Sequence, residues 1–191
     1  MKKLIIILTS ILITITGYGQ FTGKMIFHTM DEDKVFTVYS ADAGYRYEFN
    51  ENNSKGIVIV KKDSPDVLIL MPDQKMAMKS PATSSMSIGS DPIKSYEQYK
   101  NDGILKEIGK EIINGEECTK SVLYDKDNPN KKLYTIWYSE KYKFPLKMTS
   151  HVEGEEGSGM EMKDIKPWTP DPTSFSIPSG YQLMEMPGMN R

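Results

Sequence analysis

The chain has 191 residues, with 24 basic and 26 acidic side chains and a formal net charge of −2. This length suffices for one domain with a substantial core. The mildly acidic balance, with no basic stripe, argues against binding to nucleic acid or to anionic membrane surfaces. A single cysteine, Cys118, excludes an intramolecular disulfide, so stability must come from the burial of apolar side chains.

The start of the chain has the pattern of a secretory signal peptide. Two lysines precede the apolar segment 4–15, which is shorter than the roughly 20 residues of a membrane span. Glycines stand at the −3 and −1 positions before Gln20, as a cleavage site requires. We therefore predict that residues 1–19 are a signal peptide, and that residues 20–191 form a single periplasmic domain with no transmembrane segment in the mature chain.

The N-terminal half has the rhythm of short strands separated by turn residues. Tyr45 to Phe49 alternates aromatic and charged residues, which is the period of a half-buried strand. Met76 and Met78 share one face of another alternating segment. The strands predicted in this half are 23–30, 35–40, 45–49, 57–60, 67–71 and 75–79.

Between residues 80 and 103 the strand rhythm is interrupted. Ser80 to Asp91 is rich in Ser, Pro and Gly and has no periodicity, so we predict a loop. Asp91-Pro92 is typical of the start of a helix. A short helix with Tyr96 on its apolar side is expected to follow and to end at Asp102-Gly103.

After the helix, the residues predict an antiparallel meander. Asn114-Gly115 is the dipeptide preferred in a two-residue type I′ hairpin, because both positions require φ > 0. Asp127 to Asn130, which includes a proline, is a second turn signal. The strands predicted around these turns are 110–113, 117–124, 133–139 and 146–152, with a further strand at 160–165.

The last segment, 167–191, contains repeated prolines and is expected to run extended over the surface. Phe175, Ile177 and Tyr181 are the residues predicted to anchor it on the sheet. The whole pattern predicts a mainly β fold: a single curved antiparallel sheet that forms an unclosed half-barrel. One short helix and the loop 80–91 are expected to cover its concave side.

Three motifs of the C-terminal half resemble known proteins. They are Ile113-Asn-Gly-Glu-Glu-Cys118, the Trp137 strand followed by Phe144-Pro145-Leu146-Lys147, and Phe175-Ser-Ile-Pro-Ser-Gly-Tyr181. In this order they resemble an uncharacterised family of exported Gram-negative proteins and, more distantly, the outer-membrane lipoprotein carrier and receptor proteins of the LolA/LolB-like superfamily. The resemblance implies an unclosed β-barrel with an apolar interior that accepts acyl chains. The carrier proteins have several lid helices, whereas this sequence predicts one.

The residue types that usually carry chemistry do not form a reactive pattern. His28 and His151 stand on different strands without partners at metal-binding spacing. Cys118 is predicted to be a core residue, since a strand offers no helix dipole to lower its pKa. The segment from Asp125 to Asn130 departs from a calcium loop at the required glycine and is read as a turn. We therefore predict no enzyme activity, no cofactor and no metal site.

Methionine is frequent, with 13 residues, and several of them occur in pairs spaced by two. The members of a pair share a strand face; the pairs are Met76/Met78, Met160/Met162 and Met184/Met186. Thioethers bind Cu(I), and they also form flexible apolar linings. Cu(I) binding, ligand lining and simple core filling therefore remain three open interpretations of these pairs.

The leading hypothesis is a soluble, exported, non-catalytic binding protein that holds an apolar guest, a lipid or an acylated protein, in the half-barrel. The predicted lining residues lie on the apolar faces of the strands: Tyr45, Tyr47, Met76, Met78, Tyr138, Met148, Met160 and Met162. One alternative is a structural or interaction protein of the cell envelope, with a packed interior and an envelope protein as partner. The other is a Cu(I)-binding protein that uses the paired methionines.

Overall fold

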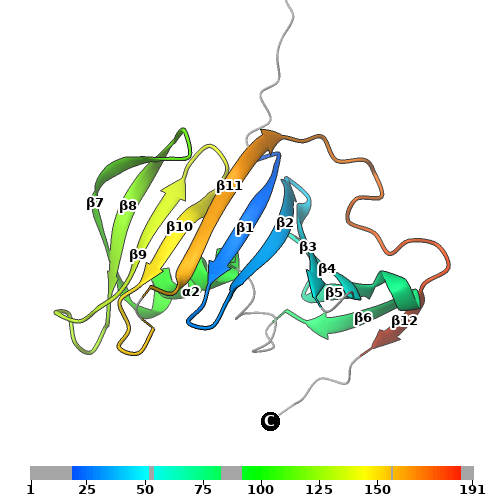
Figure 1. Ribbon diagram of the computed structural model, residues 1–191, viewed down its shortest axis with the longest axis horizontal. Coiled ribbons are helices and arrows are strands. Elements are labelled where there is room, and N and C mark those ends of the chain that lie inside the picture. Colours follow the sequence, from blue (N-terminus) through cyan, green and yellow to red (C-terminus); the bar gives the residue numbers. More distant parts are fainter. Residues whose placement is uncertain (1–18, 52–53, 83–91, 156, 186–191) are drawn as a thin grey trace, which may run out of the picture.

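The computed structural model describes residues 19–51, 54–82, 92–155 and 157–185 (Figure 1). The N-terminal half consists of six strands and one turn of 3₁₀ helix: β1 (Phe21–His28), β2 (Asp33–Ala41), β3 (Gly44–Glu51), β4 (Ser54–Lys61), β5 (Asp66–Met71), η1 (Pro72–Gln74) and β6 (Met76–Pro81). The predicted signal peptide, apart from Gly19, and most of the predicted loop, residues 83–91, lie outside the described ranges.

The C-terminal half begins with the predicted helix and continues as the predicted meander. Its elements are α2 (Pro92–Asp102), β7 (Ile104–Ile113), β8 (Glu116–Tyr124), β9 (Lys132–Ser139), β10 (Phe144–Ser150), β11 (Gly159–Pro167) and β12 (Gln182–Glu185). The turn between β7 and β8 has Asn114 at φ 50° and Gly115 at φ 84°. These values are those of the predicted type I′ hairpin.

All the strands of the described ranges belong to one 12-stranded sheet, whose order is β12-β6-β5-β4-β3-β2-β1-β11-β10-β9-β8-β7. Each half of the chain forms a meander, and the antiparallel pairing of β1 with β11 joins the two meanders into one sheet. The sheet bends strongly and its two ends, β12 and β7, stay separate (Figure 1). The predicted fold class, a curved sheet that does not close, is therefore confirmed.

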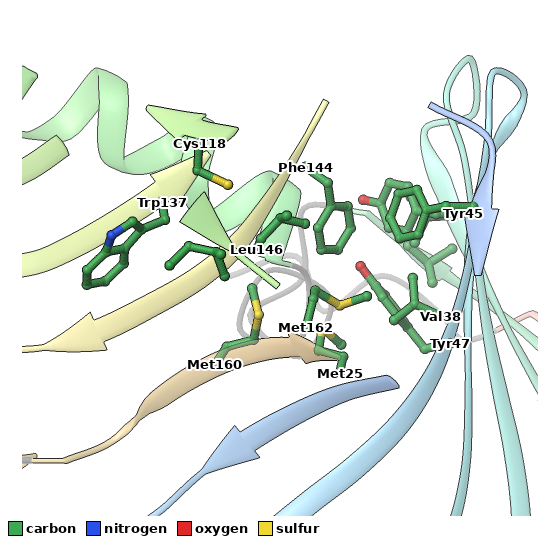
Figure 2. Packing of buried hydrophobic residues seen from close by; sticks show 14 residues of the cluster. Met25, Val38, Tyr45, Tyr47, Cys118, Trp137, Phe144, Leu146, Met160 and Met162 are labelled. Carbon is green, nitrogen blue, oxygen red and sulfur yellow. The ribbon is translucent and has the colours of Figure 1, made fainter. Parts of the chain in front are cut away.

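The main core lies between the two bent halves of the sheet. Figure 2 shows Val38, Tyr45 and Tyr47 on one side and Cys118 and Trp137 on the other, with the methionines of β1 and β11 between them. We call the face of the sheet from which Tyr47 and Met160 project the inner face. Cross-strand partners share a face, so the pairing of Met160 with Met148 also places Met148 there.

Helix α2 packs on the inner face of the C-terminal half. Its buried Tyr96 contacts Leu123 of β8 and Ile136 of β9. The ring of Tyr96 stacks on Tyr138, with ring centroids 4.7 Å apart. The helix therefore covers the part of the inner face formed by β8, β9 and β10, as Figure 1 shows, and the prediction of one short covering helix is correct for this half.

The segment after β11 packs on the opposite, outer face of the N-terminal half. Phe175, Ile177 and Tyr181, the three predicted anchors, pack against Ile57 and Ile59 of β4. The Arg46 guanidinium donates a hydrogen bond of 3.0 Å to the Ser174 carbonyl oxygen and forms an ion pair with Glu48. Burial lowers the pKa of this guanidinium, which is consistent with a side chain held beneath the segment.

One strand was not predicted. Gln182–Glu185 forms β12, which pairs in parallel with β6, so that Gln182 faces Met76 and Glu185 faces Lys79. The remaining strand pairs are antiparallel, and the expectation of a purely antiparallel sheet is wrong at this edge. Four residues between prolines carry no usable periodicity, and their partner strand is about a hundred positions away in the sequence, so no local signal pointed to this pairing.

Candidate apolar binding face

A row of partly exposed apolar side chains crosses the inner face of the N-terminal half. The row follows the register of the sheet: Met25 faces Phe36, Tyr47 faces Val58, Val58 faces Ile69 and Ile69 faces Met78. We call the half-buried residues of this row the inner strip: Phe27, Phe36, Phe49, Val58, Ile69 and Met78. The strip borders the fully buried core formed by residues such as Met25 and Tyr47.

Three phenylalanines form the aromatic part of the inner strip. The rings of Phe27 and Phe36 meet edge to face with centroids 5.4 Å apart, and those of Phe36 and Phe49 do so at 5.8 Å. Edge-to-face contacts of this kind stabilise aromatic pairs beyond the area that they bury. The row therefore has a defined shape although its members remain half-buried.

Gly56 on β4 provides the space for the last ring of this row. A Cβ atom built on Gly56 would lie 2.1 Å from Cζ of Phe49. Because real Cβ atoms do not approach a neighbour so closely, the Phe49 ring lies directly over the Gly56 backbone, and a side chain at position 56 would displace it. Glycine at this place is explained by the close approach of the ring and needs no unusual φ angle.

Two hollows flank Phe49. One has a volume of about 320 Å³ and is bordered by Phe49 of β3 and by apolar residues of β5, including Ile69 and Met71, together with the charged Lys55 and Asp73. The other has a volume of about 350 Å³ and is bordered mainly by the polar start of β2 together with Phe36. Volumes of this size lie at the lower end of those seen in small-molecule sites. The lining of the first hollow thus combines apolar side chains with charges of both signs.

The eight predicted lining residues fall into three places. Tyr45, Tyr47, Met160 and Met162 are buried in the main core, where Met162 has no exposed surface. These four side chains pack in the core and have little accessible surface of their own. Met76 and Met78 are partly exposed on β6; Met78 belongs to the inner strip, and Met76 lies next to it.

The last two predicted lining residues, Tyr138 and Met148, lie beneath helix α2. Both are partly buried against the cluster formed by Tyr96, Leu123 and Ile136. Burial raises the pKa of the Tyr138 phenol to about 12, with a smaller contribution from the nearby Glu140 carboxylate. The helix therefore occupies the part of the inner face that these two residues were predicted to offer to a guest.

Five of the six residues of the inner strip were not among the predicted lining residues: Phe27, Phe36, Phe49, Val58 and Ile69. Phe49 was assigned to the same face as Tyr45 and Tyr47, and this alternation was the available signal. Phe27 and Phe36 also alternate with Met25 and Val38, respectively. Period-2 patterning identifies a face, but it does not distinguish the covered part of that face from the accessible part.

The groups most often used in chemistry occupy structural positions. His28 Nδ1 is 2.9 Å from an Asp33 carboxylate oxygen, and His151 Nε2 is 2.7 Å from the Thr135 hydroxyl. Cys118 is fully buried, and burial raises the pKa of its thiol to about 11. Within the described ranges, no group of three His, Cys, Asp or Glu side chains is placed to hold a metal ion.

The turn between β8 and β9 is an ordinary one. An Asp125 carboxylate oxygen accepts hydrogen bonds from the backbone N–H groups of Asp127 and Asn128, at 2.8 and 3.2 Å. This is the local pattern by which an aspartate closes a turn, as predicted.

Among the residues that the structure describes, no helix is both long enough and apolar enough to cross a membrane.

Comparison with known proteins yields similarity of fold. No protein-family model matches this chain, and no curated protein matches its sequence. An uncharacterised conserved protein from Thermus thermophilus has a similar structure over 90% of this chain and 93% of its own, with a TM-score of 0.59 and 11% identity. At this identity the likeness shows a common fold and nothing further.

Two other solved structures show a weaker similarity. A LolA superfamily protein from Nitrosomonas europaea matches 83% of this chain and 90% of its own, with a TM-score of 0.44 and 11% identity. The MucA/MucB complex from Pseudomonas aeruginosa matches 88% of this chain and 59% of its own, with a TM-score of 0.46 and 10% identity. The sequence motifs were found to resemble the LolA/LolB-like superfamily, and a protein of the LolA superfamily is among the solved structures that the comparison returns.

Proposed function

We propose that this protein is an exported, non-catalytic binding protein of the periplasm that holds an apolar guest, the acyl chain of a lipid or of an acylated protein, against the inner strip. The observation that carries this proposal is the continuous row of half-buried side chains from Phe27 to Met78 beside a hollow of about 320 Å³. The lining residues proposed here are those of the inner strip, with Met76 at its end.

The energetic argument rests on burial of apolar area. Covering apolar surface contributes about 25 cal/mol per Å², so a guest that removes about 300 Å² of protein and ligand surface from water gains roughly 7 kcal/mol before the cost of association. Such a gain requires no specific polar contacts. Binding would therefore tolerate different chains, in keeping with the flexible thioether of Met78.

The first experiment uses mature protein that begins at Gln20. Native mass spectrometry of protein purified from its own envelope is expected to show a bound lipid, and titration with an acyl-chain fluorophore is expected to show about one site. A clean delipidated mass together with no fluorophore binding would overturn the proposal. The molecule would then fit the alternative of an envelope interaction protein with a filled interior.

A matched pair of variants tests the location of the guest. Phe49→Ala removes a ring of the inner strip and is expected to weaken fluorophore binding about tenfold or more, because a phenyl group contributes roughly 2 kcal/mol when buried. Val35→Ala is the control, since Val35 is 52% exposed and points to the outer face, while its neighbour Phe36 points to the inner one. Equal binding by both variants and the wild type would place any guest elsewhere.

A further inference from the structure

Strand β7 forms an open edge of the sheet. It is the last strand in the order, and in the described part of the chain its ladder partner is β8 alone. Its ten residues are mostly exposed, and Ile108 and Ile112 are 55% and 63% accessible. The opposite edge differs, because the chain's own β12 pairs with β6 there. A long edge strand with exposed isoleucines is a template for pairing with another strand.

The ladder geometry shows which backbone groups of β7 point outward. The two-residue turn makes Ile113 and Glu116 a hydrogen-bonded pair, and hydrogen-bonded pairs alternate along an antiparallel ladder. The N–H and C=O groups of Ile112 and Lys110 therefore point away from β8. The register shift between Glu107 and Gly109 changes the alternation by one, so that Glu107 and Leu105 also point outward.

These four outward residues are symmetric about the point between Ile108 and Gly109. If β7 pairs antiparallel with a second β7 about a two-fold axis at this point, Leu105 faces Ile112 and Glu107 faces Lys110. Lys106 then faces Glu111 from the next pair of positions. Each of these pairs therefore joins either two apolar residues or two opposite charges. The two-fold axis generates a second copy of each pair.

The side chains also agree with this register. Glu107 and Lys110 project on the same face of β7 because their partners on β8, Ser121 and Thr119, are two positions apart. Lys106 and Glu111 project on the other face, opposite Val122 and Cys118. Cross-strand neighbours interact only when they share a face, and both charged pairs meet this condition. The register shift between Glu107 and Gly109 thus turns the backbone groups of Glu107 and Leu105 outward, and it also keeps the paired charged side chains on the same face.

We propose that β7 is a self-recognition edge, which pairs with β7 of a second copy of this chain about a two-fold axis between Ile108 and Gly109. The lysines and the bulge on this strand are devices that usually prevent edge pairing. When the partner is another copy of this chain, each lysine lies opposite a glutamate. The charges therefore favour pairing with this strand over pairing with strands of other proteins. An interface of one strand pair is small, and the dimer is expected to be weak and concentration-dependent.

Charge exchange at Glu107 and Lys110 provides the test. Glu107→Lys alone places lysines opposite each other twice across the axis, and Lys110→Glu alone places glutamates there twice. Each variant is expected to lower the self-association constant of the mature protein about tenfold or more, in sedimentation equilibrium at low salt. An equimolar mixture of the two variants restores both opposite-charge pairs and is expected to form the heterodimer at wild-type affinity.

Glu140→Lys is the matched control, because it makes the same charge change on an exposed turn between β9 and β10, where Glu140 pairs with Lys143. It is expected to leave self-association unchanged. Circular dichroism of each variant verifies the fold. A wild-type protein that stays monomeric up to about 1 mM, or a dimer that responds equally to Glu107→Lys and Glu140→Lys, would overturn the proposal. So would a variant mixture that fails to recover the dimer.

Discussion

The strands β4 and β5 carry apolar side chains on both faces, and β3 carries them on its inner face. The two faces of this part of the sheet are covered to different extents. On the outer face, Ile59 has no exposed surface because Phe175 and its neighbours from the C-terminal segment cover it. On the inner face of the same strands, Phe49, Val58 and Ile69 remain half-buried. A segment of the chain itself thus completes one face, while the other keeps apolar area that a guest can cover.

This contrast separates folding from binding. A cover within the same chain adds to the stability of the fold, because the apolar area is removed from water in every folded molecule. The half-exposed inner strip buries less of its apolar area on folding. The remaining area can be removed from water when a guest binds. Changes under the C-terminal segment are therefore expected to act mainly on stability, and changes on the inner strip mainly on binding.

The largest effect is expected from removal of the cover. Truncation after Pro167 deletes Trp168, Phe175, Ile177 and Tyr181 from the outer cluster and leaves β6 without β12. The expected loss in the free energy of unfolding is about 5 kcal/mol or more, since several large side chains are lost at once. Urea denaturation and binding of a hydrophobic dye measure it. Truncation after Glu185 is the control and keeps all of these contacts; equal stability of the two truncations would show that the cover is dispensable.

A smaller effect separates the two faces through one residue type. Phe175→Ala should lower the free energy of unfolding by about 3 kcal/mol, because the ring is buried against β4 and β5, whereas Phe49→Ala should lower it by about 1 kcal/mol. Urea denaturation of both variants measures the difference. If Phe49→Ala proves the more damaging change, the inner strip is part of the folding core and the contrast fails.

A further prediction concerns the part of the inner face that the helix covers. Burial raises the pKa of Tyr138 to about 12, above its ordinary value of 10.0, so the folded state holds the phenol proton more tightly than the unfolded state. The stability from this group is complete below about pH 10 and is lost as the pH rises towards 12. Tyr96→Ala removes the stacked ring, and the Tyr138 pKa should fall towards 10 in a tyrosinate absorbance titration.

The matched substitution for this titration is Tyr124→Phe, which removes a phenol on β8 outside the stacked pair. It should leave the Tyr138 transition in place. A Tyr138 pKa that does not change in Tyr96→Ala would show that the helix is not what keeps this phenol from water.

The smallest effect concerns the core between the two halves. Burial raises the pKa of Cys118 to about 11 from an ordinary 9.0, so its contribution to stability is complete below about pH 9 and is lost towards pH 11. A thiol reagent at about pH 8 is expected to leave the folded protein unmodified and to react with one thiol after denaturation. Rapid modification of the folded protein would mean that the core opens easily at Cys118.

Several features of the fold were predictable from local patterns. Asn114-Gly115 identified the hairpin because type I′ geometry requires φ > 0 at both positions, and the structure has it there. Alternation placed Tyr45 and Tyr47 on the core side, and the apolar residues between prolines identified Phe175 as an anchor. The accessible site was less predictable, because Met160 and Phe36 have similar patterns and differ in what packs on them.

The amino-acid sequence by itself determined the strands other than β12, their faces, the hairpin turns and helix α2, since each depends on residues within a few positions of one another. Only the tertiary structure decided that β1 joins β11, that β12 pairs with β6, and which apolar side chains remain accessible. These outcomes depend on contacts between distant segments and on the bend of the whole sheet. Local periodicity contains no information about either of them.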